Sequence, residues 1–168
     1  MIKKFDHIAI VVPDLDEAME HYTKLFDTDK RRVVIYRDYE DTDVNTGIVD
    51  VMDFALIEVG EVWFELIAPK KADGLMAKFL EKSGPGIHHI GMTSDNIVEE
   101  WKKQSKLKDD IGVLEKKPRV DQYDVSYWFL HPKKNYGVLW EVDAWWTKTS
   151  VSDMTPVEPT PNWDEVAG

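Results

Sequence analysis

Phe5-Asp-His-Ile-Ala-Ile-Val-Val12 and Gly86-Ile-His-His-Ile-Gly-Met-Thr93 are the two stretches that decide the fold of this 168-residue chain. Each is a mostly apolar run with a histidine near its start, which is typical of a largely buried strand. A helical pattern follows each run. The first helix is predicted to begin at the N-cap Asp14, and the second at Ser94 or Asp95.

Three extended segments follow each predicted helix. After the first they span about 33–39, 49–59 and 61–68, and after the second about 112–116, 123–131 and 136–143. The order β-α-β-β-β therefore occurs twice, and a repeat of this kind indicates two copies of one small structural unit.

The repeat also predicts the domain organisation. We expect a single domain over 1–148, made of modules at about 5–69 and 86–143 joined by a short helix at 74–82. Residues 149–168 contain three prolines and four acidic residues but no lysine or arginine, so we predict a flexible acidic tail there.

The composition excludes several classes of protein. The chain has no cysteine, which rules out disulfide scaffolds, thiolate nucleophiles and cysteine-ligated metals. Its formal charge of −11 argues against nucleic acid or an anionic membrane surface as the main partner. We find no signal peptide and no run of about 20 apolar residues, so we expect a cytoplasmic protein.

A histidine and a glutamate recur at equivalent places in the two modules. His7 and His89 lie on the first strands, and Glu65 and Glu141 lie on the last ones. Four such groups converging in one cavity could bind a divalent ion, with nitrogen and oxygen ligands that suit Co, Zn, Ni, Mn or Fe. Taken singly, each histidine also fits a packed or surface side chain, and each glutamate an outward-facing one.

Further motifs match those of a known protein family. They are Phe64-Glu-Leu-Ile-Ala-Pro69, Lys78-Phe-Leu-Glu-Lys-Ser-Gly-Pro-Gly-Ile-His-His-Ile90, Lys117-Pro-Arg119 and Phe129-Leu-His-Pro-Lys133 followed by Gly137-Val-Leu-Trp-Glu141. With them, residues 5–143 resemble the vicinal-oxygen-chelate superfamily, which has the glyoxalase I fold, and are most similar to its methylmalonyl-CoA epimerases. The resemblance implies an α+β fold whose βαβββ modules form a cupped, mostly antiparallel eight-stranded sheet.

The resemblance also implies a reaction and a site. It implies one divalent metal ion on His7, Glu65, His89 and Glu141, and an epimerase that removes and returns the proton alpha to a thioester through a metal-stabilised enolate. Asp50 occupies the position where this family often has a catalytic glutamate, and Glu141 would be the second acid/base group.

Several residues are candidates for binding the substrate, an acyl-CoA or a related carbonyl compound. Trp63 and Trp128 could shape the pocket, and an anionic CoA ester requires local cations, for which the candidates include Lys117, Arg119 and Lys133. The segment after Arg119 lacks the Gly-rich stretch of the epimerases, which weakens the assignment of the substrate. We expect a homodimer, as relatives often dimerise.

Three other functions stay open. A lyase or isomerase of the glyoxalase I type would use the same four residues on an α-hydroxy carbonyl adduct. An Fe(II) dioxygenase acting on an aromatic substrate would use two histidines and one carboxylate, so Glu65 as a fourth ligand argues against it. A non-catalytic binding module would have no need of the four residues.

Overall fold

The computed structural model describes residues 1–144, 146–148, 154–156 and 160–167. They fall into two compact units. We call residues 6–41 and 48–88 the N-terminal unit, and residues 1–5, 42–47 and those from 89 onward the C-terminal unit. In the described residues no helix is long and apolar enough to span a membrane.

The N-terminal unit is built around four strands in the order β2-β3-β4-β1. β1 pairs with β4 in parallel, and β3 pairs with β4 in an antiparallel manner. In chain order the elements are β1 (Ile2–Val11), α1 (Leu15–Phe26), the 3-10 turn η1 (Thr28–Lys30), β2 (Val33–Thr42), β3 (Val49–Val59), β4 (Val62–Pro69) and α2 (Leu75–Ser83).

The strands of the C-terminal unit have the order β5-β8-β7-β6. As in the first unit, the first and last strands of the βαβββ module pair in parallel, here β5 with β8. The remaining pairs, β8 with β7 and β7 with β6, are antiparallel. The elements are β5 (Gly86–Ser94), α3 (Ile97–Lys106), α4 (Lys108–Ile111), β6 (Arg119–Val120), β7 (Ser126–Leu130), the 3-10 turn η2 (Pro132–Lys134), β8 (Trp140–Ala144), β9 (Trp146–Lys148), β10 (Met154–Pro156) and α5 (Trp163–Ala167). The predicted α+β class with two βαβββ modules is confirmed.

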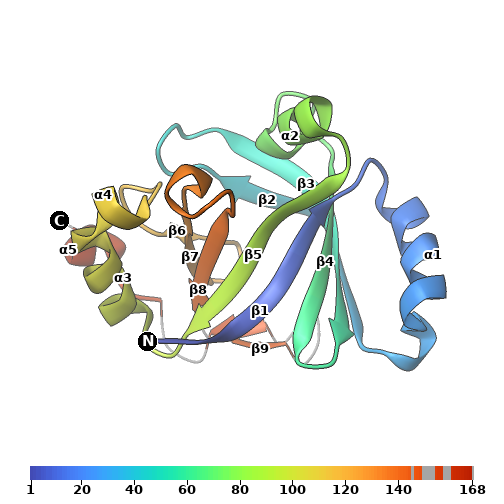
Figure 1. The fold of residues 1–168 in the computed structure, drawn as a ribbon, viewed down its shortest axis with the longest axis horizontal. Helices are drawn as coiled ribbons and strands as arrows, with labels where there is room; N and C mark the ends of the chain where they lie inside the picture. The colour runs from blue at the N-terminus through green and yellow to red at the C-terminus, as the bar shows by residue number, and fades with distance from the viewer. Residues whose placement is uncertain (145, 149–153, 157–159, 168) are drawn as a thin grey trace. The chain divides into compact units, whose positions relative to one another are not determined.

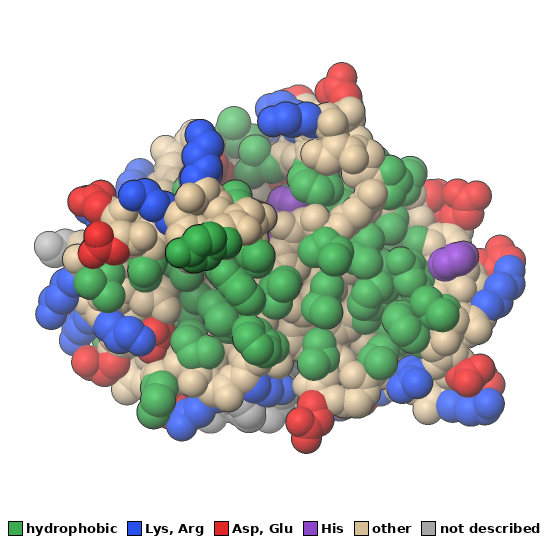
Figure 2. Space-filling model, in the orientation of Figure 1, with side chains coloured by type: hydrophobic (Ala, Val, Ile, Leu, Met, Phe, Trp, Pro, Cys, Tyr) green, Lys and Arg blue, Asp and Glu red, His purple; other side chains and the backbone are tan. Residues whose placement is uncertain are grey.

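Helix α1 covers one face of the strands in the N-terminal unit (Figure 1). The side chain of Asp14 accepts a hydrogen bond of 2.8 Å from the N–H of Glu17, so the predicted N-cap is confirmed. Behind this cap, α1 packs on the face of β3 and β4 that carries Ala55, Ile57 and Leu66. Figure 2 shows hydrophobic side chains gathered over β1 and β4 beside this helix. The opposite face of these strands is therefore the one left for a site.

Helix α3 closes the core of the C-terminal unit with an aromatic cluster. Trp101 on α3 meets Trp128 on β7 edge to face at 5.3 Å between ring centroids. The indole N–H of Trp128 donates to Gln104 over 2.9 Å, so this fully buried ring leaves no unsatisfied donor. A helix placed in this way fixes which face of β7 is core, and it leaves Phe129 on the other face.

Two local predictions in the second module were wrong. Asn96, not Ser94 or Asp95, caps α3, because its side chain accepts the N–H of Glu99 at 2.9 Å. The strand predicted at about 112–116 is reduced to a single bridge between Val113 and Leu130, and the paired strand β6 comes later. The reason is Glu115, whose carboxylate accepts the N–H of Phe129 in place of a backbone carbonyl.

The predicted tail is only partly described. Residues 149–153, 157–159 and 168 lie outside the described residues, but α5 is described and packs on α3. Trp163 of α5 is buried, contacts Trp101 at 6.2 Å between ring centroids and donates its indole N–H to Ser126. The described part of the tail thus contains a helix that packs on the C-terminal unit, and the flexibility predicted for residues 149–168 stays a prediction.

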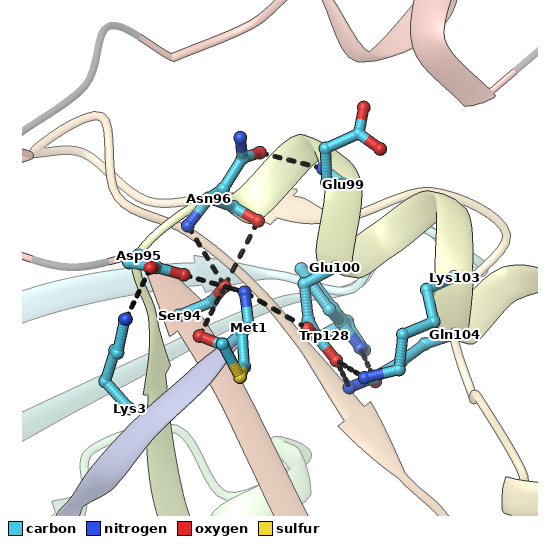
Figure 3. Close-up of polar contacts among 10 residues, drawn as sticks. All are labelled: Met1, Lys3, Ser94, Asp95, Asn96, Glu99, Glu100, Lys103, Gln104 and Trp128. Carbon is cyan, nitrogen blue, oxygen red and sulfur yellow. Dashed lines mark hydrogen bonds and ion pairs between the residues drawn. The ribbon is translucent and has the colours of Figure 1, made fainter.

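A polar network ties β5 and α3 to the start of the chain (Figure 3). The terminal ammonium of Met1 lies 2.7 Å from Asp95 Oδ1 and 3.4 Å from Glu100 Oε2. Glu100, which is buried, also accepts from Gln104, the residue that holds Trp128. The network therefore links the first residue to the aromatic core of the same unit.

Asp95 gives this network a measurable pH dependence. The hydrogen bond from Lys3, followed by that from the terminal ammonium, lowers the pKa of Asp95 from 3.8 to about 2. A carboxylate with a lowered pKa stabilises the fold above its unfolded pKa and loses that effect as the pH falls. We expect Asp95→Asn to lower the free energy of unfolding at neutral pH, with a difference from wild type that shrinks as the pH falls from 3.8 toward 2. Urea unfolding at a series of pH values measures this difference, and one that is independent of pH would contradict it.

Candidate functional site

The N-terminal unit brings two of the predicted ligands together. Ala9 pairs with Glu65 across β1 and β4, and His7 lies two residues before Ala9 on the same face of β1. Nε2 of His7 is 3.6 Å from Oε2 of Glu65. Phe64 and Leu66 pack on the α1 side, so Glu65 points to the opposite face.

A second carboxylate orients the imidazole of His7. Nδ1 of His7 lies 3.1 Å from Oδ2 of Asp6, and both side chains are buried. A carboxylate on one ring nitrogen fixes the ring and keeps the other nitrogen available as a ligand, an arrangement that recurs around metal-bound histidines. Nε2 is thus the nitrogen of His7 that can bind a metal ion.

The C-terminal unit contains the matching pair with the same register. Gly91 pairs with Glu141 across β5 and β8, and His89 lies two residues before Gly91. Nε2 of His89 is 3.1 Å from Oε2 of Glu141. In both modules, therefore, the histidine lies two residues before the residue that pairs with the glutamate, and the strands of the histidine and the glutamate run parallel.

The donor atoms of each pair fit a divalent transition metal. Nitrogen and carboxylate oxygen bind such an ion at about 2.0–2.2 Å, so two neighbouring ligand atoms at a right angle are about 3 Å apart. The distances of 3.6 and 3.1 Å are close to that spacing. Each histidine–glutamate pair could hold a metal ion, and the chemistry of the donors does not fix which metal.

Phe129 holds His89 from the side, and a buried ion pair supports Phe129. The ring of Phe129 meets His89 edge to face at 5.5 Å, and the guanidinium of Arg119 lies 5.4 Å from the Phe129 ring centroid. Nε of Arg119 donates to Glu115 over 3.1 Å. Burial raises the pKa of Glu115, although the Phe129 N–H and Arg119 favour its charged form. Arg119, predicted to bind substrate, is thus a buried group that also contacts the ring beside His89.

Asp50 is the second residue of β3, and its buried side chain lies against the N-terminus of α2. One of its carboxylate oxygens accepts the N–H of Val51 at 2.9 Å, and the other accepts the N–H of Met76 at 3.0 Å. Gly74, the N-cap of α2, has no side chain to cap that helix, so Asp50 satisfies one of its free N–H groups. The acid/base role predicted for Asp50 stays a prediction, and any such role has to share this carboxylate with the helix.

A substitution of Gly74 tests how tightly the chain packs around Asp50. The backbone of Gly74 is ordinary for any residue, with φ −70° and ψ 165°, but a Cβ there would overlap the Asp50 carboxylate. We expect Gly74→Ala to lower the free energy of unfolding by about 2 kcal/mol, the usual cost of overpacking. Gly86→Ala is the matched control, because a Cβ at Gly86 meets nothing within 4 Å. Urea unfolding measures the free energy of unfolding of both variants, and equal values would contradict the close packing of Gly74 against Asp50.

The two candidate pocket tryptophans occupy different surroundings. Trp63 shares the Glu65 face of β4, is 5% exposed and lies under the guanidinium of Arg32, with Cζ 5.0 Å from the ring centroid. Trp128 is fully buried in the core beneath α3. The geometry therefore keeps Trp63 as a candidate next to His7 and Glu65, and it gives Trp128 a packing role.

The two candidate lysines line separate hollows of the C-terminal unit. Lys117 pairs with Asp164 of α5 at the edge of a cavity of about 580 Å³. Lys133 lies on η2 at a groove of about 360 Å³ that also contains Lys108, Lys134 and His131. This groove is a concentration of positive charge on an acidic chain.

Three residues that lie near the predicted ligands were not predicted from the sequence. Asp6 directly precedes His7, and this adjacency was an available signal for its orienting role. Glu115 and Arg32 gave no such signal. Their places follow from strand pairing that brings Glu115 to Phe129, and Arg32 to Trp63, from distant parts of the chain.

Comparisons with known proteins place this geometry in a family. The family profile of the Glyoxalase/Bleomycin resistance protein/Dioxygenase superfamily matches residues 6–129. The mitochondrial methylmalonyl-CoA epimerase of Dictyostelium discoideum is 29% identical over 143 residues, which is 84% of this chain and 78% of the relative. The ethylmalonyl-CoA/methylmalonyl-CoA epimerase of Cereibacter sphaeroides is 27% identical over 85% of this chain and 98% of the relative.

A solved structure agrees with these sequence matches. The methylmalonyl-CoA epimerase of Mycobacterium tuberculosis is 26% identical and superposes with a TM-score of 0.62, covering 84% of this chain and 87% of that one. The predicted similarity to the epimerases is thereby confirmed. With a family match over residues 6–129 and this fold, the chain belongs to the Glyoxalase/Bleomycin resistance protein/Dioxygenase superfamily.

Proposed function

We propose that this protein is a divalent-metal-dependent epimerase acting on an acyl-CoA of the methylmalonyl type. The observation that carries the proposal is the equal register of the two histidine–glutamate pairs, each with its two donor atoms near the spacing of ligands on one ion. Relatives named as epimerases of methylmalonyl-CoA and ethylmalonyl-CoA support the choice of substrate.

Both pairs are proposed to hold the same ion, of Co, Zn, Ni, Mn or Fe. Two carboxylates, Glu65 and Glu141, would balance its double positive charge, and the neutral imidazoles of His7 and His89 would complete the protein ligands. A divalent ion bound there supplies a Lewis acid that stabilises negative charge on the thioester oxygen while the neighbouring C–H bond breaks.

The protein's own carboxylates would move the proton. The Glu141 carboxylate accepts the α-proton on one face of the substrate, and the C–H electron pair passes into the enolate. Asp50, in its protonated form, donates a proton to the other face of the same carbon, so the product has the opposite configuration. The reverse reaction exchanges the two roles, and exchange with water resets both groups between turnovers.

The lysine groove is proposed to bind the nucleotide end of the CoA ester. Lys108, Lys133 and Lys134 surround it with one opposing carboxylate, Asp109. Phosphate oxygens are strongly attracted to such a cluster, whereas most of this acidic chain repels them. Lys117 is a further proposed contact, although Asp164 competes for its ammonium.

Deuterium exchange tests the proposal. Methylmalonyl-CoA is incubated in D2O with the metal-loaded protein, and the loss of the α-proton is followed by NMR. We expect exchange that depends on the metal and on enzyme concentration. Its absence at high enzyme concentration would contradict the proposal, and turnover of methylglyoxal with a thiol instead would favour a glyoxalase I-type reaction.

A further inference from the structure

Arg32 immediately precedes β2 and lies on the face of the N-terminal unit that carries His7 and Glu65. Its carbonyl accepts the N–H of Glu58 at 2.9 Å, which fixes the backbone to β3. The next residue, Val33, packs on the α1 side with Phe64, whereas Val34 is buried in the alternate direction. By this alternation Arg32 shares the face opposite α1 with Trp63 and Glu65.

The guanidinium of Arg32 has donors without acceptors. Nε and Nη2 are buried, and among the described residues neither has a hydrogen-bond partner. Arg32 also forms no ion pair within that part of the chain, and its guanidinium lies over the ring of Trp63. A buried donor left unsatisfied costs about 1–3 kcal/mol, and more when it is charged, so this arrangement calls for an acceptor that arrives from outside.

Trp63 places that guanidinium beside the candidate metal ligands. Trp63 pairs directly with His7 across β4 and β1, and it precedes Glu65 by two residues on the same face. Arg32 lies 5.0 Å above the Trp63 ring, which holds the planar group by a cation–π contact. An anionic group that reaches His7 and Glu65 would therefore find the free N–H groups of Arg32 close by.

We infer that Arg32 is an oxyanion-binding residue of the substrate pocket, held on Trp63 and completed only when a carboxylate or phosphate oxygen of the ligand accepts from Nε and Nη2. This inference rests on the proposed acyl-CoA function and specifies how that substrate is recognised. A guanidinium suits the task because its planar fork matches two oxygens of one group. Burial strengthens the interaction, since Nε and Nη2 of Arg32 are shielded from solvent.

Binding titrations by calorimetry test the inference with three thioesters. Malonyl-CoA carries both a carboxylate and phosphates, malonyl-pantetheine carries the carboxylate alone, and butyryl-CoA carries the phosphates alone. We expect Arg32→Gln to weaken malonyl-CoA binding about 10- to 100-fold, the effect of losing charge-assisted hydrogen bonds. Arg32→Lys should recover only part of the affinity, because it restores charge without the fork.

The three ligands identify which oxyanion is bound. If the loss extends to malonyl-pantetheine but not butyryl-CoA, Arg32 binds the carboxylate; if it extends to butyryl-CoA but not malonyl-pantetheine, Arg32 binds a phosphate. Either result supports the inference. Unchanged binding of all three ligands, an equal loss for all three, or a wild type that binds none of them would overturn it.

Two controls separate binding from folding and from the proposed reaction. Arg31→Gln removes the same charge from the neighbouring exposed residue, whose guanidinium donates to the Phe26 carbonyl, and it should bind all three thioesters like wild type. Arg32→Met should unfold no more easily than wild type, because it removes a half-buried guanidinium whose Nε and Nη2 have no hydrogen-bond partner among the described residues. A wild type that binds malonyl thioesters through Arg32 but exchanges no α-proton would contradict the proposed function and leave this inference standing.

Discussion

Replacing His89 with alanine is expected to reduce α-proton exchange of methylmalonyl-CoA about 1000-fold and to lower the metal content of the purified protein. The proposed ion contributes several kcal/mol to stabilising the charge that develops on the thioester oxygen, and each 1.4 kcal/mol corresponds to a factor of ten in rate. Without Nε2 of His89, Glu141 also loses the partner that lies 3.1 Å away. NMR in D2O measures the exchange, and elemental analysis measures the metal.

His88→Ala is the matched control for this experiment. His88 is the preceding residue on the same strand, and its ring packs edge to face on Phe79 of α2 at 4.9 Å. Adjacent strand residues point to opposite faces, so this histidine is outside the proposed ligand set. We expect His88→Ala to keep its metal and most of its exchange activity. Equal losses in the two variants would contradict the assignment of His89.

Glu141→Gln is expected to lower α-proton exchange by about 10²- to 10⁴-fold while the protein keeps its metal ion. The amide retains an oxygen that can bind a metal, but it cannot accept the α-proton, and general base catalysis contributes about that factor. The variant thereby separates the two roles proposed for Glu141. Exchange rates at saturating metal, together with metal content, measure the two effects.

Glu65→Gln makes the same chemical change in the other module. Glu65 is proposed to bind metal but not to move a proton, so this variant should lose much less activity than Glu141→Gln at saturating metal. If both variants lose activity equally, the assignment of the base to Glu141 is wrong. If Glu141→Gln loses its metal altogether, the two roles of that residue cannot be separated in this way, and the claim of a retained site fails.

The His–Glu pairs could be predicted from the sequence because strands have a strict alternation of side chains. His7 and Glu65 interrupt apolar stripes on their strands, as do His89 and Glu141, and the repeat showed that the two sets correspond. The structure adds that the histidine strand and the glutamate strand of each module pair in parallel, with a two-residue offset that brings Nε2 and Oε2 together. Register of this kind depends on backbone pairing, which residue types alone do not specify.

Trp128 and Arg119 show what alternation leaves undecided. The alternation of side chains along a strand predicts that Trp128 and Phe129 lie on opposite faces of the sheet. It does not predict which of the two faces a helix covers. The hydrogen bond from Trp128 to Gln104 of α3 decides it, since a buried indole requires an acceptor. Arg119 was predicted from the need for cations near an anionic substrate, whereas its buried partner Glu115 is brought to it by the interrupted strand before β6.

Arg32 could not be found from the sequence for a related reason. It lies just before an edge strand, 31 residues from Trp63, and β3 separates β2 from β4 in the sheet. Only the fold reveals that the two side chains meet on the face of the candidate ligands. Likewise, the composition of the C-terminal segment predicts a tail and does not reveal that Trp163, with Val166 and Ala167, packs on the core of the C-terminal unit.

Titration with Co²⁺, followed by its visible absorption and by calorimetry, tests most directly the claim that both His–Glu pairs share one ion. We predict one tightly bound Co²⁺ per chain, with the same site lost in His7→Ala and in His89→Ala, although these residues belong to different modules. Two independent sites, each lost in only one of the variants, or no tight site in the wild type, would contradict the account.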